Sequence, residues 1–103
     1  MINKEQCYWV YILHCSNNTY YTGYTNNLEK RYQLHLNGTA KCKYTRSFKP
    51  TCIAQFWKIN GDKALAMKTE RAIKKLTRVE KEVIISEPLR LSIHVPSLLQ
   101  YLI

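Results

Sequence analysis

Several features that define other protein classes are missing from this sequence. No apolar run reaches the ~18 residues that a membrane-spanning helix needs, and residues 1–6 lack the apolar core of a signal peptide. The four cysteines form no C-x-x-C pair, which disfavours a structural zinc site and, without an export signal, predicts free thiols. No internal repeat, linker or low-complexity tract divides the 103 residues. We therefore expect a cytoplasmic protein with one globular domain.

Acidic residues are scarce. Seven aspartates and glutamates stand against 16 lysines and arginines, which gives a formal charge of +9. Residues 30–49 contain six basic and no acidic residues, and residues 63–81 contain seven basic and two acidic ones. Such a surplus predicts a polyanionic partner, either nucleic acid or an anionic membrane face. For residues 63–81, an ordinary solvated helix face is an alternative explanation.

The segment after residue 40 combines cations with an aromatic ring and hydroxyl groups, in what reads as a loop to about Pro50. Cations neutralise phosphates, and aromatic rings stack on nucleic-acid bases. The candidates for nucleic-acid contact are Lys41, Lys43, Tyr44 and Arg46, with Lys30 as a lesser candidate.

The hydrophobic pattern and the turn residues predict an α+β fold. Strands are expected over residues 7–15, 19–24 and 51–59, the first two forming a hairpin, and helices over residues 27–37, 63–76 and 80–85. Asn26 is the predicted N-cap of the first helix, Gly38 its C-terminal stop, and Asp62 the N-cap of the second helix. The result is a small three-stranded antiparallel sheet flanked by helices.

The C-terminal segment is unusually apolar for a chain end. Leu89, Leu91, Ile93 and Val95 alternate as in a strand, up to Pro96. We expect a domain over residues 1–86 and an apolar extension over residues 87–103. Because exposed apolar surface tends to be covered, this extension should pack on the domain, on a second copy as a homodimer, or on another protein partner.

A set of polar residues, spread along the chain, is the most specific feature of the sequence. The hairpin carries Tyr11-Ile12-Leu13 and Tyr21-Thr22-Gly23, two tyrosines ten residues apart on paired strands. Arg31 follows on the first helix, His35 comes four residues later, and Glu70 lies on the next long helix. In this order the residues resemble the GIY-YIG nuclease superfamily over residues 8–85. The stretch Lys43-Tyr44-Thr45-Arg46 is similar to the loop of its small, stand-alone bacterial members.

The resemblance implies a metal-dependent endonuclease that hydrolyses nucleic-acid phosphodiester bonds, most readily DNA with low sequence specificity, and no membrane partner. Glu70 would hold one Mg²⁺ or Mn²⁺ ion, because a single carboxylate does not readily hold two. Arg31 would stabilise charge on the phosphate. Tyr11 would act as general base with Tyr21 orienting water or phosphate. His35 is the alternative base, since its ordinary pKa lies nearer neutrality.

Other interpretations stay open. The first motif reads Trp9-Val10-Tyr11 instead of Gly-Ile-Tyr, and no second DNA-binding domain is evident. The alternative function is a non-catalytic nucleic-acid-binding module or subunit that retains the GIY-YIG fold. Glu70 could simply pair with Lys74, four residues on, and the two tyrosines could be half-buried strand residues.

Overall fold

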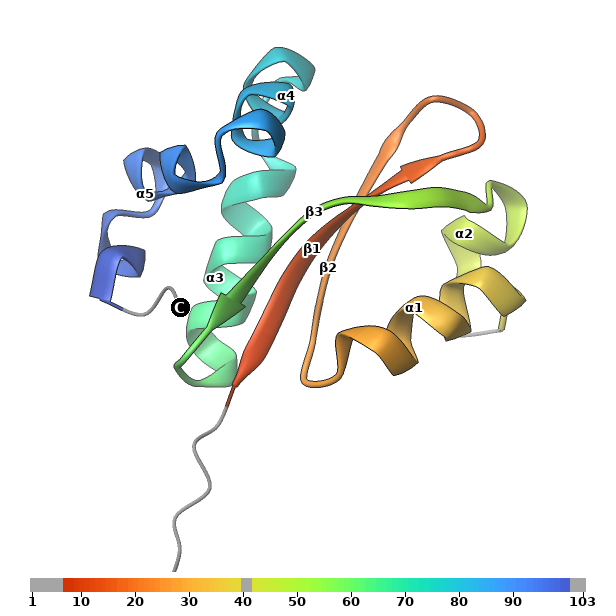
Figure 1. The fold of residues 1–103 in the computed structure, drawn as a ribbon, viewed down its shortest axis with the longest axis horizontal. Helices are drawn as coiled ribbons and strands as arrows, with labels where there is room; N and C mark the ends of the chain where they lie inside the picture. The colour runs from red at the N-terminus through yellow and green to blue at the C-terminus, as the bar shows by residue number, and fades with distance from the viewer. Residues whose placement is uncertain (1–6, 40–41, 101–103) are drawn as a thin grey trace, which may run out of the picture.

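The computed structural model describes residues 7–39 and 42–100 and has the predicted α+β architecture. A three-stranded sheet with strand order β2-β1-β3 lies between two groups of helices, and both strand pairs are antiparallel. Helices α3, α4 and α5 cover one side of the sheet, and α1 and α2 lie on the other (Figure 1). In chain order the elements are β1 (Tyr8–Cys15), β2 (Tyr20–Thr25), α1 (Leu28–Asn37), α2 (Lys43–Ser47), β3 (Pro50–Ile59), α3 (Lys63–Lys74), α4 (Arg78–Ser86), η1 (Pro88–Arg90), α5 (Leu91–His94) and η2 (Pro96–Gln100).

The central strand β1 supplies both cores of the molecule. Successive side chains of a strand point to opposite faces of its sheet. Val10 and Ile12 accordingly belong to the core on the α3 side, whereas Tyr11, Leu13 and Cys15 belong to a smaller core on the α1 side. All five are at most 1% exposed. Tyr11 is therefore a core residue of the α1 side, and its phenol is the part of it that can take part in chemistry.

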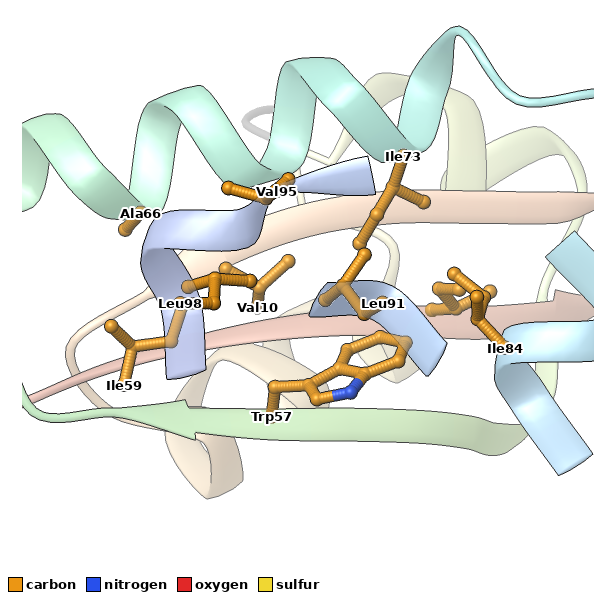
Figure 2. Close-up of a cluster of buried hydrophobic side chains, with 10 residues drawn as sticks. Val10, Trp57, Ile59, Ala66, Ile73, Ile84, Leu91, Val95 and Leu98 are labelled. Atoms are coloured by element: carbon orange, nitrogen blue, oxygen red, sulfur yellow. The ribbon is translucent and has the colours of Figure 1, made fainter. Parts of the chain in front are cut away.

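The larger core joins the sheet to α3, α4, α5 and η2 (Figure 2). Trp57 of β3 packs in it, and its indole Nε1 donates a hydrogen bond of 2.8 Å to the carbonyl oxygen of Pro88. The buried residues of this core are Val10, Ile12, Trp57, Ile59, Ala66, Ile73, Ile84, Leu91, Val95 and Leu98. Helix α3 is thus held firmly against the sheet, which determines where its polar face lies.

The C-terminal segment is helical, so the strand predicted from its alternation is wrong. Leu91, Val95 and Leu98 are at most 1% exposed and pack into the larger core, because spacings of four and three residues place them on one side of helical turns. Leu89 and Ile93 remain 72% and 66% exposed. A partner or second copy at this surface stays a prediction.

Two local predictions near α1 also need correction. The N-cap of α1 is Asn27 rather than Asn26, and its side chain accepts a hydrogen bond from the Lys30 backbone N–H. The predicted basic loop contains the short helix α2, which begins after Cys42. Gly38 ends α1 as predicted, in the left-handed conformation with φ 66°. Among the described residues, no helix is long and apolar enough to cross a membrane.

Candidate functional site

One pocket collects side chains from four separate elements. It has a volume of about 370 Å³, and Tyr11 of β1, Tyr21 and Gly23 of β2, Arg31 of α1 and Glu70 of α3 all line it. The rest of the lining comes from Tyr8, Tyr24, Thr25, Asn26 and Lys63. Four of the five residues predicted as catalytic or metal-binding therefore meet in one hollow, large enough for a phosphate group with water around it.

His35, the fifth, lies behind Tyr11 instead of at the pocket surface. Its ring is fully buried. Nε2 is 2.8 Å from the Tyr11 hydroxyl oxygen, and Nδ1 is 2.7 Å from Thr45 Oγ1 on α2. Burial, assisted by the nearby charge of Arg31, lowers the pKa of His35 to about 4. At neutral pH the ring is therefore uncharged, and it can reach a substrate only through Tyr11.

The two phenols are strongly held in their neutral form. Burial raises the pKa of Tyr11, and the Arg31 guanidinium offsets only part of that effect. Burial also raises the pKa of Tyr21, again against the influence of Arg31. Desolvation disfavours a phenolate more than one neighbouring cation favours it. Without a bound substrate, both tyrosines are thus hydrogen-bonding groups and not charged bases.

Arg31 and His35 lie one helical turn apart on α1, as their spacing predicted. Arg31 lines the main pocket and also a smaller hollow that it shares with Lys30, which is exposed. Burial disfavours the charge of Arg31, but a hydrogen bond with Tyr11 and the proximity of Tyr11, Cys42 and Tyr21 outweigh burial, so the pKa of Arg31 is raised. A permanently charged planar fork at this place suits a phosphate oxygen pair.

Glu70 is the carboxylate of the site. Its side chain is 16% exposed and lies 3.6 Å from the ammonium of Lys74, so the simple ion pair considered from the sequence is present. Of the described residues that line the pocket, Glu70 alone carries a carboxylate. No group of three or more histidine, cysteine or acidic side chains that could hold a metal occurs among residues 7–39 and 42–98. One hard oxygen ligand beside an open, wettable pocket fits one Mg²⁺ or Mn²⁺ that keeps most of its waters.

Helix α2 extends the site along the surface. Tyr44 is 37% exposed, and its ring stacks on that of Tyr21, with centroids 5.9 Å apart and an interplanar angle of 21°. Lys43 and Arg46 are exposed on the same short helix. Lys41, the remaining candidate for nucleic-acid contact, lies outside the described residues. Helix α2, which carries these two cations, therefore contacts the pocket lining through Tyr44 and Tyr21.

Sequence reasoning missed several residues of the site. Lys63 lines the pocket from the first position of α3, and its spacing of seven residues from Glu70 was a usable signal, because two helical turns return to the same face. Asn26, which was predicted only as a helix cap, lines the pocket as well. Thr45 supports His35 from α2. Thr45 lies within the stretch Lys43-Tyr44-Thr45-Arg46 that resembles the family loop, but nothing in that stretch predicted its contact with His35, which depends on how α2 packs on α1.

Comparisons with known proteins identify the family of the chain. The profile of the GIY-YIG catalytic domain matches residues 7–82. A UPF0213 protein of Clostridium perfringens is 46% identical over 78 residues, which are 76% of this chain and 82% of the relative. A UPF0213 protein of Syntrophus aciditrophicus is 40% identical over 79 residues, which are 77% and 90% of the two chains. The solution NMR structure of a UPF0213 protein from Bacillus halodurans is 36% identical and covers 78% of this chain and 83% of that one, with a TM-score of 0.49.

Proposed function

This chain belongs to the GIY-YIG catalytic-domain family, and we propose that it is a metal-dependent endonuclease that hydrolyses phosphodiester bonds of DNA with little sequence preference. The observation that carries the proposal is the meeting of two phenols, one guanidinium and one carboxylate in a single pocket. Hydrolysis of a phosphodiester needs a positioned water, stabilisation of charge on the phosphate and acceptance of a proton. These four groups can supply the first two, and Tyr11 can pass the proton on to His35 behind it.

Binding of the phosphate is assigned to Arg31. Its guanidinium can donate two parallel hydrogen bonds to the non-bridging oxygens, and it stays charged as negative charge increases in the transition state. Lys63 at the start of α3 and Lys30 on α1 are further cations beside the two hollows. Tyr21 would orient the phosphate or the attacking water by its hydroxyl group.

Tyr11 and His35 are proposed to act together as the proton acceptor. The attacking water would pass a proton to the Tyr11 oxygen, while the Tyr11 O–H proton transfers to His35 Nε2, which lies 2.8 Å from the Tyr11 oxygen. In this arrangement Tyr11 never has to exist as a free phenolate. Protonating His35 at pH 7 against a pKa of about 4 costs about 4 kcal/mol. A bound phosphodiester lowers this cost, because its negative charge neutralises Arg31, which disfavours the imidazolium.

Glu70 is the residue that would hold one Mg²⁺ or Mn²⁺, with waters and phosphate oxygens as the other ligands. Such an ion supplies Lewis-acid stabilisation of the charge on the phosphate and the leaving oxygen. Glu70 then has to exchange its contact with Lys74 for the ion. Because the Lys74 side chain is 53% exposed, that exchange is inexpensive.

The test is nicking of supercoiled plasmid in Mg²⁺ or Mn²⁺ by the wild type and by Arg31→Ala and Glu70→Ala. Losing a transition-state contact of this kind lowers the rate by about 10²–10³-fold, whereas the control Arg71→Ala, exposed on α3 next to Glu70, should leave it unchanged. Cleavage that survives both substitutions undiminished would contradict the assignment of the site.

A second candidate function is binding without turnover, and the ion pair of Glu70 with Lys74 favours it. In that case Glu70 serves the stability of α3 and no metal is bound. Gel shifts across a salt series would show DNA binding that weakens with salt, with no metal-dependent product. Metal-dependent nicking that Glu70→Ala abolishes would exclude this candidate.

A further inference from the structure

Thr45, in the middle of α2, has a hydroxyl group with two buried partners. Its O–H donates to the carbonyl oxygen of Cys42 over 3.2 Å, and its oxygen lies 2.7 Å from His35 Nδ1. A threonine hydroxyl has one proton but two lone pairs. Because that proton is donated to Cys42, the Thr45 oxygen accepts the hydrogen bond from the ring, which requires the proton of His35 on Nδ1.

The position of the proton on the His35 ring decides whether Tyr11 can transfer its O–H proton to Nε2. A neutral imidazole carries one N–H, and its other nitrogen is an acceptor. With the proton on Nδ1, the bare Nε2 accepts the Tyr11 O–H, as proton transfer requires. With the proton on Nε2, the ring would donate to Tyr11 instead, and Tyr11 would have no acceptor at His35.

We propose that Thr45 is a positioning residue that holds His35 in the Nδ1–H tautomer and thereby makes Nε2 the acceptor for the Tyr11 proton. Both His35 and Thr45 have no exposed surface, so bulk water does not compete for either ring nitrogen. The catalytic consequence rests on the proposed function. The tautomer itself does not, because it can be measured without any substrate.

Long-range ¹H–¹⁵N correlation spectra of the ¹⁵N-labelled protein at pH 7 report the tautomer of each of the three histidines, and the His35→Gln spectrum assigns the signals. The expected result is Nδ1–H for His35 in the wild type, a change to Nε2–H in Thr45→Val, and return to Nδ1–H in Thr45→Ser. Thr22→Val is the matched control, because Thr22 is 3% exposed and its hydroxyl has no partner among the described residues. Nε2–H in the wild type, or Nδ1–H retained in Thr45→Val, would overturn the proposal.

Plasmid nicking by the same variants tests the catalytic part. Thr45→Val should lower kcat by about a hundredfold with KM unchanged, and Thr45→Ser should restore most of it, since a purely structural defect would not follow the tautomer. A changed tautomer with an unchanged kcat and pH profile would overturn the positioning role. Absence of nicking by the wild type would contradict the proposed nuclease function, while the tautomer measurement would still decide the assignment to Thr45.

Discussion

Gly23 lies directly opposite Tyr11 in the β1–β2 pair, and a Cβ atom at Gly23 would sit 2.5 Å from the Tyr11 hydroxyl oxygen. Gly23 is not among the residues with positive φ, so its backbone does not require glycine. The missing side chain instead leaves the space that the Tyr11 phenol occupies on its way to His35. The Tyr11 ring can therefore occupy this position only because residue 23 is a glycine.

Gly23→Ala should displace the Tyr11 ring and break its hydrogen bond to His35. We expect a loss of about 1–3 kcal/mol in the free energy of unfolding, typical of overpacking, together with loss of nicking. The measurement is urea denaturation of Gly23→Ala, of Tyr11→Phe and of the double variant. Removing the hydroxyl relieves part of the clash, so the double variant should lose less than the sum of the single losses. Simple additivity would show that the two residues do not compete for this space.

Glu70→Gln should abolish nicking at every concentration of Mg²⁺ or Mn²⁺, because the neutral amide lacks the charge that holds the ion. Lys74→Ala is the matched variant, since it removes only the other member of the ion pair. It should change the free energy of unfolding by less than about 1 kcal/mol and leave activity in place or raise apparent metal affinity. Titration of the metal in the nicking assay measures the activity and the apparent metal affinity of each variant, and urea denaturation measures the free energy of unfolding. Equal losses of nicking activity in Glu70→Gln and Lys74→Ala would indicate that activity depends on the ion pair and not on a bound metal.

The low pKa of His35 predicts an acid-sensitive fold. The unfolded ring has a pKa near 6.5 and the folded one about 4, so between these values the unfolded state binds more protons. The stabilising contribution is therefore fully present above about pH 6.5 and is lost as the pH falls toward 4, by about 3 kcal/mol at most. The free energies of unfolding of the wild type and of His35→Gln should be measured from pH 6.5 to pH 4. Their difference should shrink by about 3 kcal/mol as the pH falls. Parallel curves would contradict a buried, neutral His35.

Leu91→Ala and Leu89→Ala form a matched pair on the C-terminal segment. Leu91 has no exposed surface and packs in the larger core, whereas Leu89 is 72% exposed. The first substitution should lower the free energy of unfolding by about 2–5 kcal/mol, and the second should change it by less than about 0.5 kcal/mol. Thermal and urea denaturation check both. Equal effects would mean that the segment does not dock on the sheet as described.

Lys43 and Arg46 should contribute to DNA affinity through phosphates. Each phosphate contact to duplex DNA adds about 0.9 to the negative slope of log K against log salt concentration. Lys43→Ala and Arg46→Ala are thus expected to reduce that slope by about one each, in fluorescence anisotropy across a salt series. Arg90→Ala is the control and should leave the slope unchanged. Arg90 ends η1, which joins α4 to α5, and these two helices lie on the opposite side of the sheet from α2 (Figure 1). A slope unaffected by all three changes would place the DNA elsewhere.

Most of the fold followed from local patterns. The run of β-branched, aromatic and aliphatic residues over β1, the turn residues after Cys15 and the caps Gly38 and Asp62 predicted strands and helices that the structure contains. These signals are local because side-chain periodicity and capping hydrogen bonds involve residues at most a few positions apart. The same locality explains the errors. Asn26 and Asn27 are equally good caps, and the spacing of Leu89 to Val95 fits a strand as long as nothing shows which residues are buried.

By itself, the sequence determined the three strands, helices α1, α3 and α4, the basic charge and the ordered set from Tyr11 to Glu70 that resembles the family. Only the tertiary structure decided that Glu70 reaches the same pocket as Tyr11 and that His35 lies buried behind the phenol, in contact with Thr45. The reason is physical. These contacts join segments that are distant in the chain, and they depend on which face of the sheet each helix covers. The protonation of His35 follows from desolvation, which exists only once that packing is complete.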